Sequence, residues 1–190
     1  MTDQLRPKQI VRYHPLSQLL HWLTVALILV QFTWAWRIDQ AEGFRVRFEL
    51  VTQHKSLGMA VLLLVLARLI WRFIVKPPPL PSHRPAWERR AAAWGHGLLY
   101  ALIIAMPLSG WAYSSAAGLG DFWWGPINWP SLVGANESLE DVMRRVHQVV
   151  GLSLGAVAVG HALVALRHHF FLKDEILLRM LPSGRRRGQD

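Results

Sequence analysis

The sequence has no cysteine, which excludes a disulfide framework, a thiolate metal site and any cofactor joined through a thioether. Charged residues make up only 17% of the 190 residues, whereas hydrophobic residues make up 52%. This composition is typical of a membrane protein rather than of a water-soluble domain. No Gly/Ser-rich linker or internal repeat divides the chain, so we expect one domain over residues 1–190.

Four apolar segments are each long enough to cross a bilayer, which takes about 20 helical residues. We expect membrane-spanning helices at Leu16–Trp36, His54–Val75, Trp94–Tyr113 and Val146–Leu166. The first is too long for a signal peptide and contains polar Gln18, His21 and Gln31, so we expect it to be retained. The sequence therefore predicts an all-α integral membrane protein, a bundle of four transmembrane helices.

The connections contain recognisable stop and start signals. The proline-rich KPPPLPSHRP separates the second span from the third, because consecutive prolines cannot continue a helix. Ser138 and Asp141 have the spacing of a capping box, which predicts that the fourth helix begins before the bilayer. Within the C-terminal tail, residues 170–190, the segment EILLRML predicts a short amphipathic helix on the membrane surface.

Lys and Arg residues gather on one side of the expected bundle. Fourteen lie in the N-terminal arm, the second connection and the C-terminal tail: Arg6, Lys8, Arg12, Arg72, Lys76, Arg84, Arg89, Arg90, Arg167, Lys173, Arg179, Arg185, Arg186 and Arg187. Five lie on the other side: Arg37, Arg45, Arg47, Arg144 and Arg145. Because cytoplasmic loops carry an excess of Lys and Arg, we expect both termini in the cytoplasm. These cations flank apolar segments, so the net charge of +9 indicates contact with membrane lipid and no nucleic acid.

Four of the nine histidines lie in the expected spans at positions that pair by depth. His147 and His161 are 14 positions apart, which in a helix is a rise of about 21 Å and about 40° short of whole turns. Their rings therefore face the same side, one near each end of the span. His21 lies near the cytoplasmic end of the first span and His54 opens the second span on the far side. We expect the pairs His21–His161 and His54–His147.

Two pairs of inward-facing imidazoles are what two bis-histidine haems need inside a four-helix bundle. Taken alone, each histidine has the simpler interpretation of an interhelical hydrogen bond. None of the four apolar segments contains Asp or Glu, which disfavours a zinc site, a proton-linked transporter and a carboxylate-bound non-haem iron. We therefore predict two haems b, with axial iron ligands His21, His54, His147 and His161.

Two glycines and one arginine lie at matching positions. Gly58 and Gly151 each follow a predicted ligand by one turn and would leave room for a flat porphyrin, although close helix packing also uses glycine. Arg68 lies 14 positions after His54, on the same face but at the depth of the other pair. We predict that Arg68 binds a haem propionate; the alternative is that it reaches lipid phosphates.

Four segments carry a resemblance to a known family: LSQLLHWLTVALILV, HKSLGMAVLLLVLARLIWR, WGHGLLYALIIAMPLSGW and HQVVGLSLGAVAVGHALVALRHHFFLKDEILLRMLP. They cover nearly the whole chain and resemble the bacterial cytochrome b561 family, most of all its small di-haem type that oxidises superoxide and reduces ubiquinone. The resemblance implies a four-helix bundle in the bacterial inner membrane with two b haems, held by the same four histidines. Bis-histidine iron has no open position, which favours outer-sphere electron transfer.

Cations flank the predicted outer site formed by His54 and His147. Superoxide is a small anion, and a positive potential raises the rate at which such an anion arrives. We predict that Lys55, Arg144 and Arg145 steer superoxide toward this site. The alternative is a solvated rim in which carboxylates neutralise these cations, together with Arg45 and Arg47. The carboxylates concerned are Asp39, Glu42, Glu49, Glu140 and Asp141.

The resemblance implies a quinone, and we expect the cytoplasmic side to bind it. His168 lies two turns beyond His161 and about 20° off its face, so it would sit just below the inner site. We predict that His168 contacts the quinone and supplies a proton; the alternative is an interfacial histidine that only reaches water. His96 in the third span lies near the same side and is a secondary candidate for contact with a propionate or the quinone.

The same features also fit two functions other than superoxide oxidation. One is a cytochrome b subunit or quinone-linked carrier that serves a partner dehydrogenase or hydrogenase. Its docking surface would be the loop with Phe122, Trp123, Trp124 and Trp129, which otherwise forms an interfacial belt. The other is a cytochrome that accepts electrons from a soluble periplasmic donor. A bis-histidine relay does not determine the direction of transfer.

Overall fold

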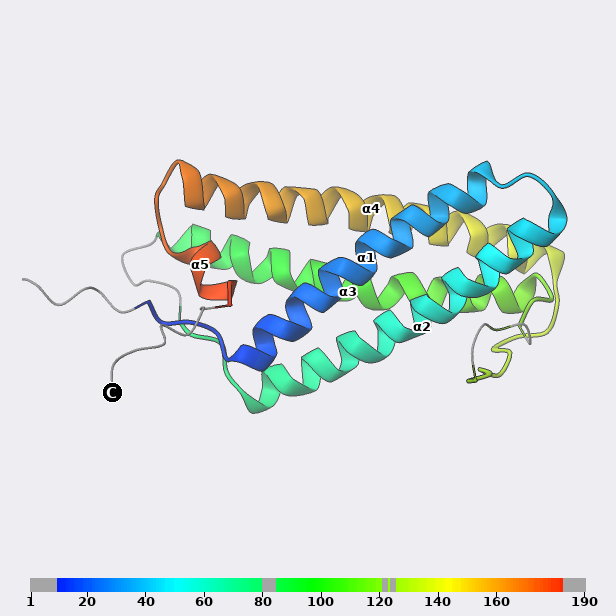
Figure 1. Ribbon diagram of the computed structural model, residues 1–190, viewed down its shortest axis with the longest axis horizontal. Coiled ribbons are helices and arrows are strands. Elements are labelled where there is room, and N and C mark those ends of the chain that lie inside the picture. The colour runs from blue at the N-terminus through cyan, green and yellow to red at the C-terminus, as the bar shows by residue number, and fades with distance from the viewer. Residues whose placement is uncertain (1–9, 80–84, 121–122, 124–125, 183–190) are drawn as a thin grey trace, which may run out of the picture.

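The computed structural model describes residues 10–79, 85–120, 123 and 126–182. Regular structure in these residues is entirely helical, with no strand. The helices are α1 (Pro15–Gln40), α2 (Phe44–Ile74), α3 (Ala86–Ala116), α4 (Glu137–Phe170) and α5 (Ile176–Met180) (Figure 1). The all-α prediction is confirmed for this part of the chain.

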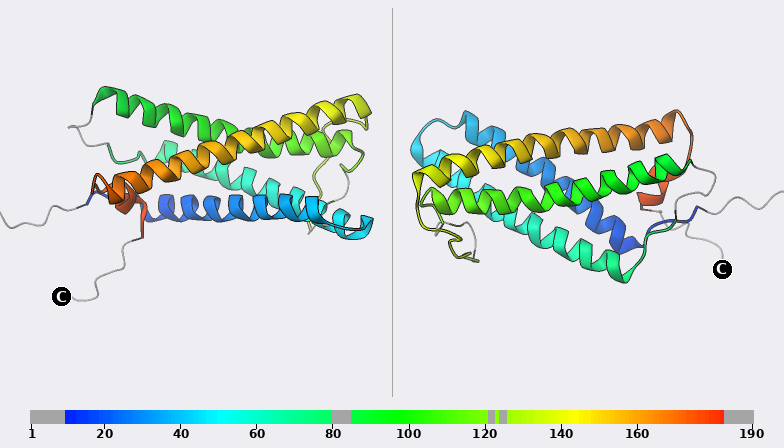
Figure 2. Two further views of the ribbon diagram at one scale, coloured as in Figure 1. Left: turned by 90° about the horizontal axis from the view of Figure 1, so that it is seen from above. Right: turned by 180° about the vertical axis from the view of Figure 1, so that it is seen from behind.

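The four long helices lie side by side along the long axis of the molecule (Figure 2). Packing is closest between α3 and α4, followed by α1 with α2 and α2 with α3. Consecutive helices run in opposite directions, so the start of α1 and the end of α4 lie together at what we call the terminal end (Figure 1). The opposite end carries the α1–α2 turn and the α3–α4 connection, and we call it the loop end.

All four long helices have the length and the apolar composition needed to cross a membrane. Large apolar side chains cover the outside of the bundle; for example, Leu19 is 61% exposed and Leu152 is 75% exposed. The buried apolar cluster is small and consists of Val61, Val65, Ile103 and Leu154. An apolar exterior of this extent suits lipid rather than water as the surrounding solvent.

Two helix starts differ from the sequence predictions. α2 begins at Phe44 and α3 at Ala86, well before the predicted His54 and Trp94. The 31 residues of α2 rise about 46 Å, more than the roughly 30 Å of a hydrocarbon core. Hydropathy marks only the part of a helix that suits lipid, whereas the backbone hydrogen bonds continue into polar sequence.

The predicted capping box at the start of α4 is wrong. The residue that caps the helix is Asn136, whose side-chain oxygen accepts a hydrogen bond from the N–H of Leu139 at 2.9 Å. Ser138 lies inside the first turn. The backbone N–H of Asn136 also donates to the carbonyl of Ala116, at 2.9 Å, and this tie to the end of α3 determines where α4 begins.

The short helix predicted in the tail is present as α5 and lies against the start of α1. The Arg12 guanidinium donates to the carbonyls of Leu178 and Leu181, at 2.9 and 2.8 Å. The indole N–H of Trp22 donates to the carbonyl of Met180 at 2.9 Å. These bonds satisfy the carbonyls at the end of a five-residue helix, which has too few internal hydrogen bonds to be stable alone.

Candidate functional site

Two histidine pairs face each other across the bundle, one toward each end. The ring centroids of His21 and His161 are 6.5 Å apart, and those of His54 and His147 are 6.3 Å apart. Two imidazoles that share one metal ion have centroids about 6 Å apart, because each metal–nitrogen bond is about 2 Å long. The spacing of both pairs therefore fits a metal ion bound between the two rings.

Each pair joins α4 to a helix that is not its main packing partner. His147 and His161 both come from α4, which packs mainly against α3, whereas His21 comes from α1 and His54 from α2. His161 is exposed, and the other three rings are half-buried. A flat macrocycle between facing helices needs separation of this kind, and bundle cores are where such cofactors bind.

The outer pair, His54 and His147, contains one ring in a defined orientation. Nδ1 of His147 lies 3.1 Å from the carbonyl oxygen of Met106 and 3.1 Å from Oγ of Ser109. A carbonyl only accepts, so Nδ1 carries the proton and Nε2 is the nitrogen available to bind a metal. This contact to a backbone carbonyl is the kind that orients histidine ligands, and the role of His147 as an axial ligand stays a prediction.

Gly110 on α3 provides the space for the His147 ring. A Cβ added at Gly110 would lie 2.8 Å from Cε1 of His147 and 3.2 Å from its Nδ1. Sequence reasoning missed Gly110 and Ser109. The only signal is their place in the PLSG segment, where a glycine follows a proline inside a helix and loosens it.

The partner ring of His54 is held through its backbone. The side-chain amide of Gln31 on α1 donates to the carbonyl of His54 at 3.1 Å. Nδ1 of His54 is buried and has no hydrogen-bond partner within the described residues. A Cβ added at Gly58 would lie 3.0 Å from Nε2 of Gln31, and a Cβ added at Gly151 would lie 3.0 Å from Cε of Met106. Their role in packing a porphyrin stays a prediction.

The inner pair has two further nitrogen donors beside it. Nη2 of Arg68 donates to Nδ1 of His21 at 2.9 Å, and its guanidinium lies 5.5 Å from the ring of Tyr100. A guanidinium only donates, so a metal at Nε2 of His21 requires Arg68 to release this contact. The ring centroid of His96 lies 5.5 Å from that of His161. The sequence-predicted Arg68 and His96 are thus both brought to the inner pair.

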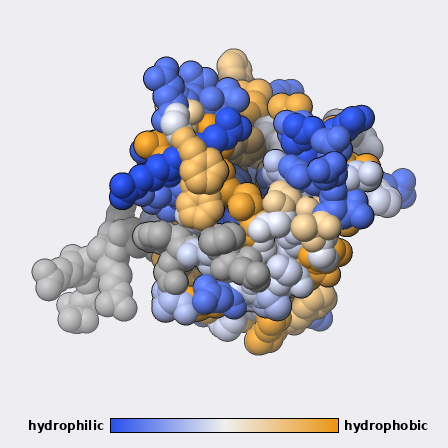
Figure 3. Space-filling view, turned by 90° about the vertical axis from the view of Figure 1, so that its right-hand side faces the viewer, coloured by the Kyte–Doolittle hydropathy of each residue, from blue (hydrophilic) through white to orange (hydrophobic). Residues whose placement is uncertain are grey.

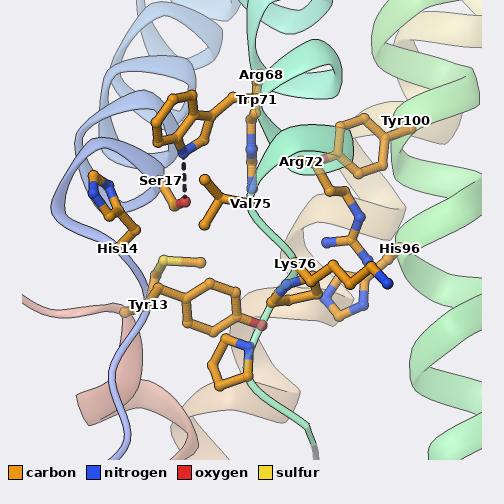
Figure 4. Close-up of a pocket in the computed structure, with 13 residues that line it drawn as sticks. Tyr13, His14, Ser17, Arg68, Trp71, Arg72, Val75, Lys76, His96 and Tyr100 are labelled. Atoms are coloured by element: carbon orange, nitrogen blue, oxygen red, sulfur yellow. Dashed lines mark hydrogen bonds between the residues drawn. The ribbon is translucent and has the colours of Figure 1, made fainter.

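A pocket of about 60 Å³ opens beside this inner site, at the terminal end (Figure 4). Its wall is rich in cations and aromatic rings: Tyr13, His14, Ser17, Arg68, Trp71, Arg72, Val75, Lys76, Pro77, Pro78, His96, Tyr100 and Met180. The indole of Trp71 on α2 donates to Oγ of Ser17 on α1 at 3.0 Å, which ties the two helices at the pocket. Carboxylates of a haem or an anionic headgroup would be electrostatically favoured here.

His168 lies at the end of α4, away from both pairs. Its Nδ1 is 2.5 Å from Oδ2 of Asp174, and the two side chains are only 12% and 20% exposed. Sequence reasoning selected His168 but missed Asp174. The segment HHFFLKD places that carboxylate six residues later, and only the turn before α5 shows that the chain folds back.

Two of the cations predicted to steer superoxide at the loop end, Lys55 and Arg144, have partners. Nζ of Lys55 donates to the carbonyl of Leu119 and lies 4.3 Å from the centroid of the Trp123 ring. Arg144 pairs with Asp141, whereas Arg145 is exposed. Figure 3 shows this end, where hydrophilic and hydrophobic side chains are interspersed. Asp141 therefore neutralises Arg144, as the alternative interpretation expects. The steering of superoxide by Lys55, Arg144 and Arg145 stays a prediction.

Of the predicted docking loop, Trp123 and Trp129 are described, and Phe122 and Trp124 lie outside the described residues. The indole N–H of Trp123 donates to the carbonyl of Trp129 at 3.0 Å. The ring of Trp129 lies 5.8 Å from that of Trp111 on α3. These rings contact their own chain, and both interpretations of the loop, docking surface and interfacial belt, stay predictions.

Comparison with known proteins agrees with this geometry. Residues 12–183 match a family described as prokaryotic cytochrome b561. The chain is 32% identical to cytochrome b561 homolog 2 of Escherichia coli, over 90% of this chain and 91% of that protein. It is also 32% identical to the probable superoxide oxidase CybB of Yersinia pestis, over 92% and 98%. Identity to cytochrome b562 of Cereibacter sphaeroides is 29%, over 89% and 94%.

Proposed function

The chain belongs to the prokaryotic cytochrome b561 family, and on that premise we propose that it oxidises superoxide and reduces ubiquinone. Membership of the family makes it a haem b protein that transfers electrons in a bacterial membrane, which it crosses several times. The proposal of superoxide as donor is supported by the relative named a probable superoxide oxidase, at 32% identity.

The observation that carries the proposal is the presence of two histidine pairs at two depths. We assign His21 with His161, and His54 with His147, as the axial ligands of two haems b. Haem b supplies reversible one-electron transfer when it is bound. The protein's own contribution is to orient the ring of His147: the Met106 carbonyl accepts from Nδ1, which leaves Nε2 available to iron, and Gly110 leaves room for the ring.

The orientation in the membrane follows from charge. The terminal end carries the larger number of Lys and Arg residues, so we place it, with both termini, in the cytoplasm and the chain in the inner membrane. The loop end then faces the periplasm, where Arg145 and Lys55 would raise the local concentration of superoxide. The whole chain, residues 1–190, acts as one domain.

The overall reaction balances with two donors for each acceptor. Two superoxide ions are oxidised to two molecules of O₂ and release two electrons. One ubiquinone takes up these two electrons and two protons and becomes ubiquinol. We place the quinone headgroup at the terminal end, near His168, because its reduction requires protons from the cytoplasmic water.

A rapid-mixing absorbance experiment tests this function. Purified, oxidised protein in lipid nanodiscs is mixed with superoxide, first alone and then with ubiquinone. We expect reduced b-type bands to rise quickly and to disappear once ubiquinone is added. Protein that carries haem but stays oxidised in superoxide would refute the donor. It would favour the alternative of a cytochrome b subunit or carrier that receives its electrons from a partner dehydrogenase or hydrogenase.

A further inference from the structure

We propose that Asp174 positions His168 for proton delivery to the quinone, by holding the imidazole in one tautomer. This inference rests on the proposed function, since it assigns the proton path of the same quinone site. Oδ2 of Asp174 accepts a hydrogen bond from Nδ1 of His168 at 2.5 Å. A carboxylate cannot donate, so the proton of this bond belongs to Nδ1, and Nε2 is the nitrogen that exchanges a proton with another group.

The backbone of the turn is shaped to bring these two side chains together. Lys173, directly before Asp174, has a φ of 50°, a left-handed conformation that is unfavourable for a residue with a Cβ. The backbone N–H of Asp174 donates to the carbonyl of His168 at 3.1 Å. The chain therefore turns back on the end of α4 at the cost of a strained residue, and the result is a carboxylate against an imidazole.

Asp174 also has a structural contact through its other oxygen. Oδ1 accepts a hydrogen bond from the N–H of Ile176 at 3.0 Å, at the start of α5. Many solvated carboxylates accept a hydrogen bond from a backbone N–H at the start of a helix, so the contact of Oδ1 needs no further explanation. It does not explain why Oδ2 faces His168 in a site where the two side chains are 12% and 20% exposed.

The proton step is simple to state. His168, protonated on both nitrogens, gives the proton on Nε2 to a carbonyl oxygen of the reduced quinone, so that an N–H bond breaks and an O–H bond forms. The histidine is left as the neutral Nδ1–H tautomer, which is the tautomer that Asp174 binds. Cytoplasmic water then returns a proton to Nε2. The two electrons in the quinone come from superoxide, as in the proposed function.

Asp174→Asn separates this role from a purely structural one. An asparagine has the same shape, still accepts from the N–H of Ile176 and still bonds to Nδ1, so a structural tie survives. Its amide, however, donates to Nδ1 and stabilises the opposite tautomer, in which Nε2 keeps its proton. Glu175→Gln makes the same change from acid to amide one residue later and is the matched control, because Glu175 makes no side-chain cap to α5.

The kinetic test starts from reduced protein, so that it does not depend on superoxide. Haem-loaded protein in nanodiscs is reduced with dithionite, freed of excess reductant and mixed with ubiquinone-1, and reoxidation is followed by absorbance. We expect Asp174→Asn to slow the rate at saturating ubiquinone-1 by about 100-fold, the low end of what a positioned general acid contributes. The KM for ubiquinone-1 should change less than about twofold, and Glu175→Gln should behave as wild type.

A second readout reports on the tautomer without turnover. Solid-state NMR of ¹⁵N-histidine protein, with the His168 signal assigned by His168→Gln, should show Nδ1–H in the wild type and Nε2–H in Asp174→Asn. Normal reoxidation of Asp174→Asn, or an unchanged tautomer, would overturn the inference and leave the proposed function intact. A wild-type protein that ubiquinone-1 does not reoxidise would overturn the proposed quinone chemistry and the inference with it.

Discussion

Gly110→Ala is the sharpest test of the outer haem site. The new Cβ would lie 2.8 Å from Cε1 of His147, whereas ordinary van der Waals contact begins at 3.4 Å. The atom it meets belongs to a ring that the Met106 carbonyl also holds, so the ring must move by about 0.6 Å, three times the roughly 0.2 Å that metal–ligand distances tolerate.

The cost of this overpacking is about 1–3 kcal/mol. Since 1.4 kcal/mol is a factor of ten in an equilibrium constant, we expect the outer haem to bind about 5- to 140-fold more weakly. The assay is the ratio of haem to protein in purified samples, from the pyridine haemochromogen spectrum. We expect the ratio to fall from two per chain toward one, while the helix content measured by circular dichroism stays constant.

The control is Gly134→Ala, since an added Cβ at Gly134 has no atom within 4 Å. Two haems per chain in both variants, with unchanged spectra, would refute the reasoning. It would mean either that His147 is not a ligand or that its ring does not depend on the space beside Gly110.

Three further predictions follow from the geometry of the two ends. His21→Ala should remove one haem and His54→Ala the other, so that haem content halves in each variant and loss of both from either one would contradict separate sites. Arg145→Glu should slow the reduction of haem by superoxide about tenfold at low salt. The effect should exceed that of Arg144→Glu, because Arg144 already pairs with Asp141. The same effect at low and at high ionic strength would argue against steering. Arg12→Ala removes a charged donor from two carbonyls, costs about 1.5–3 kcal/mol, and should speed hydrogen exchange in residues 176–180.

The number of long helices could be predicted from sequence, but their starts could not. A bilayer-length apolar segment needs no knowledge of its neighbours, so the four spans are visible in composition alone. The start of α4 depends on the hydrogen bond from Asn136 to Ala116, which joins residues twenty positions apart. Both Asn136 and Ser138 are good capping residues, and only that tertiary contact decides between them.

The histidine pairs could be expected because depth in a membrane helix depends only on rise per residue. That rise was enough to pair His21 with His161 and His54 with His147. The structure places the ring centroids of each pair within 6.5 Å of each other. Gly110 and Asp174 could not be found in the same way. Gly110 acts through a contact between two helices, and Asp174 acts through a strained turn at Lys173. Neither contact produces a periodic pattern of residues that sequence reasoning could detect.

The hydrogen bonds that hold α5 against α1 also impose an order on synthesis. They join Arg12 and Trp22 to residues that lie 158 to 169 positions further along the chain. A ribosome makes the N-terminal partners first, so these donors must wait until almost the entire polypeptide has been translated. The inner histidine pair is completed almost as late, because His161 is made only 15 residues before α5 begins at Ile176. The terminal end of the bundle is therefore assembled last, from the first and the last residues of the described chain.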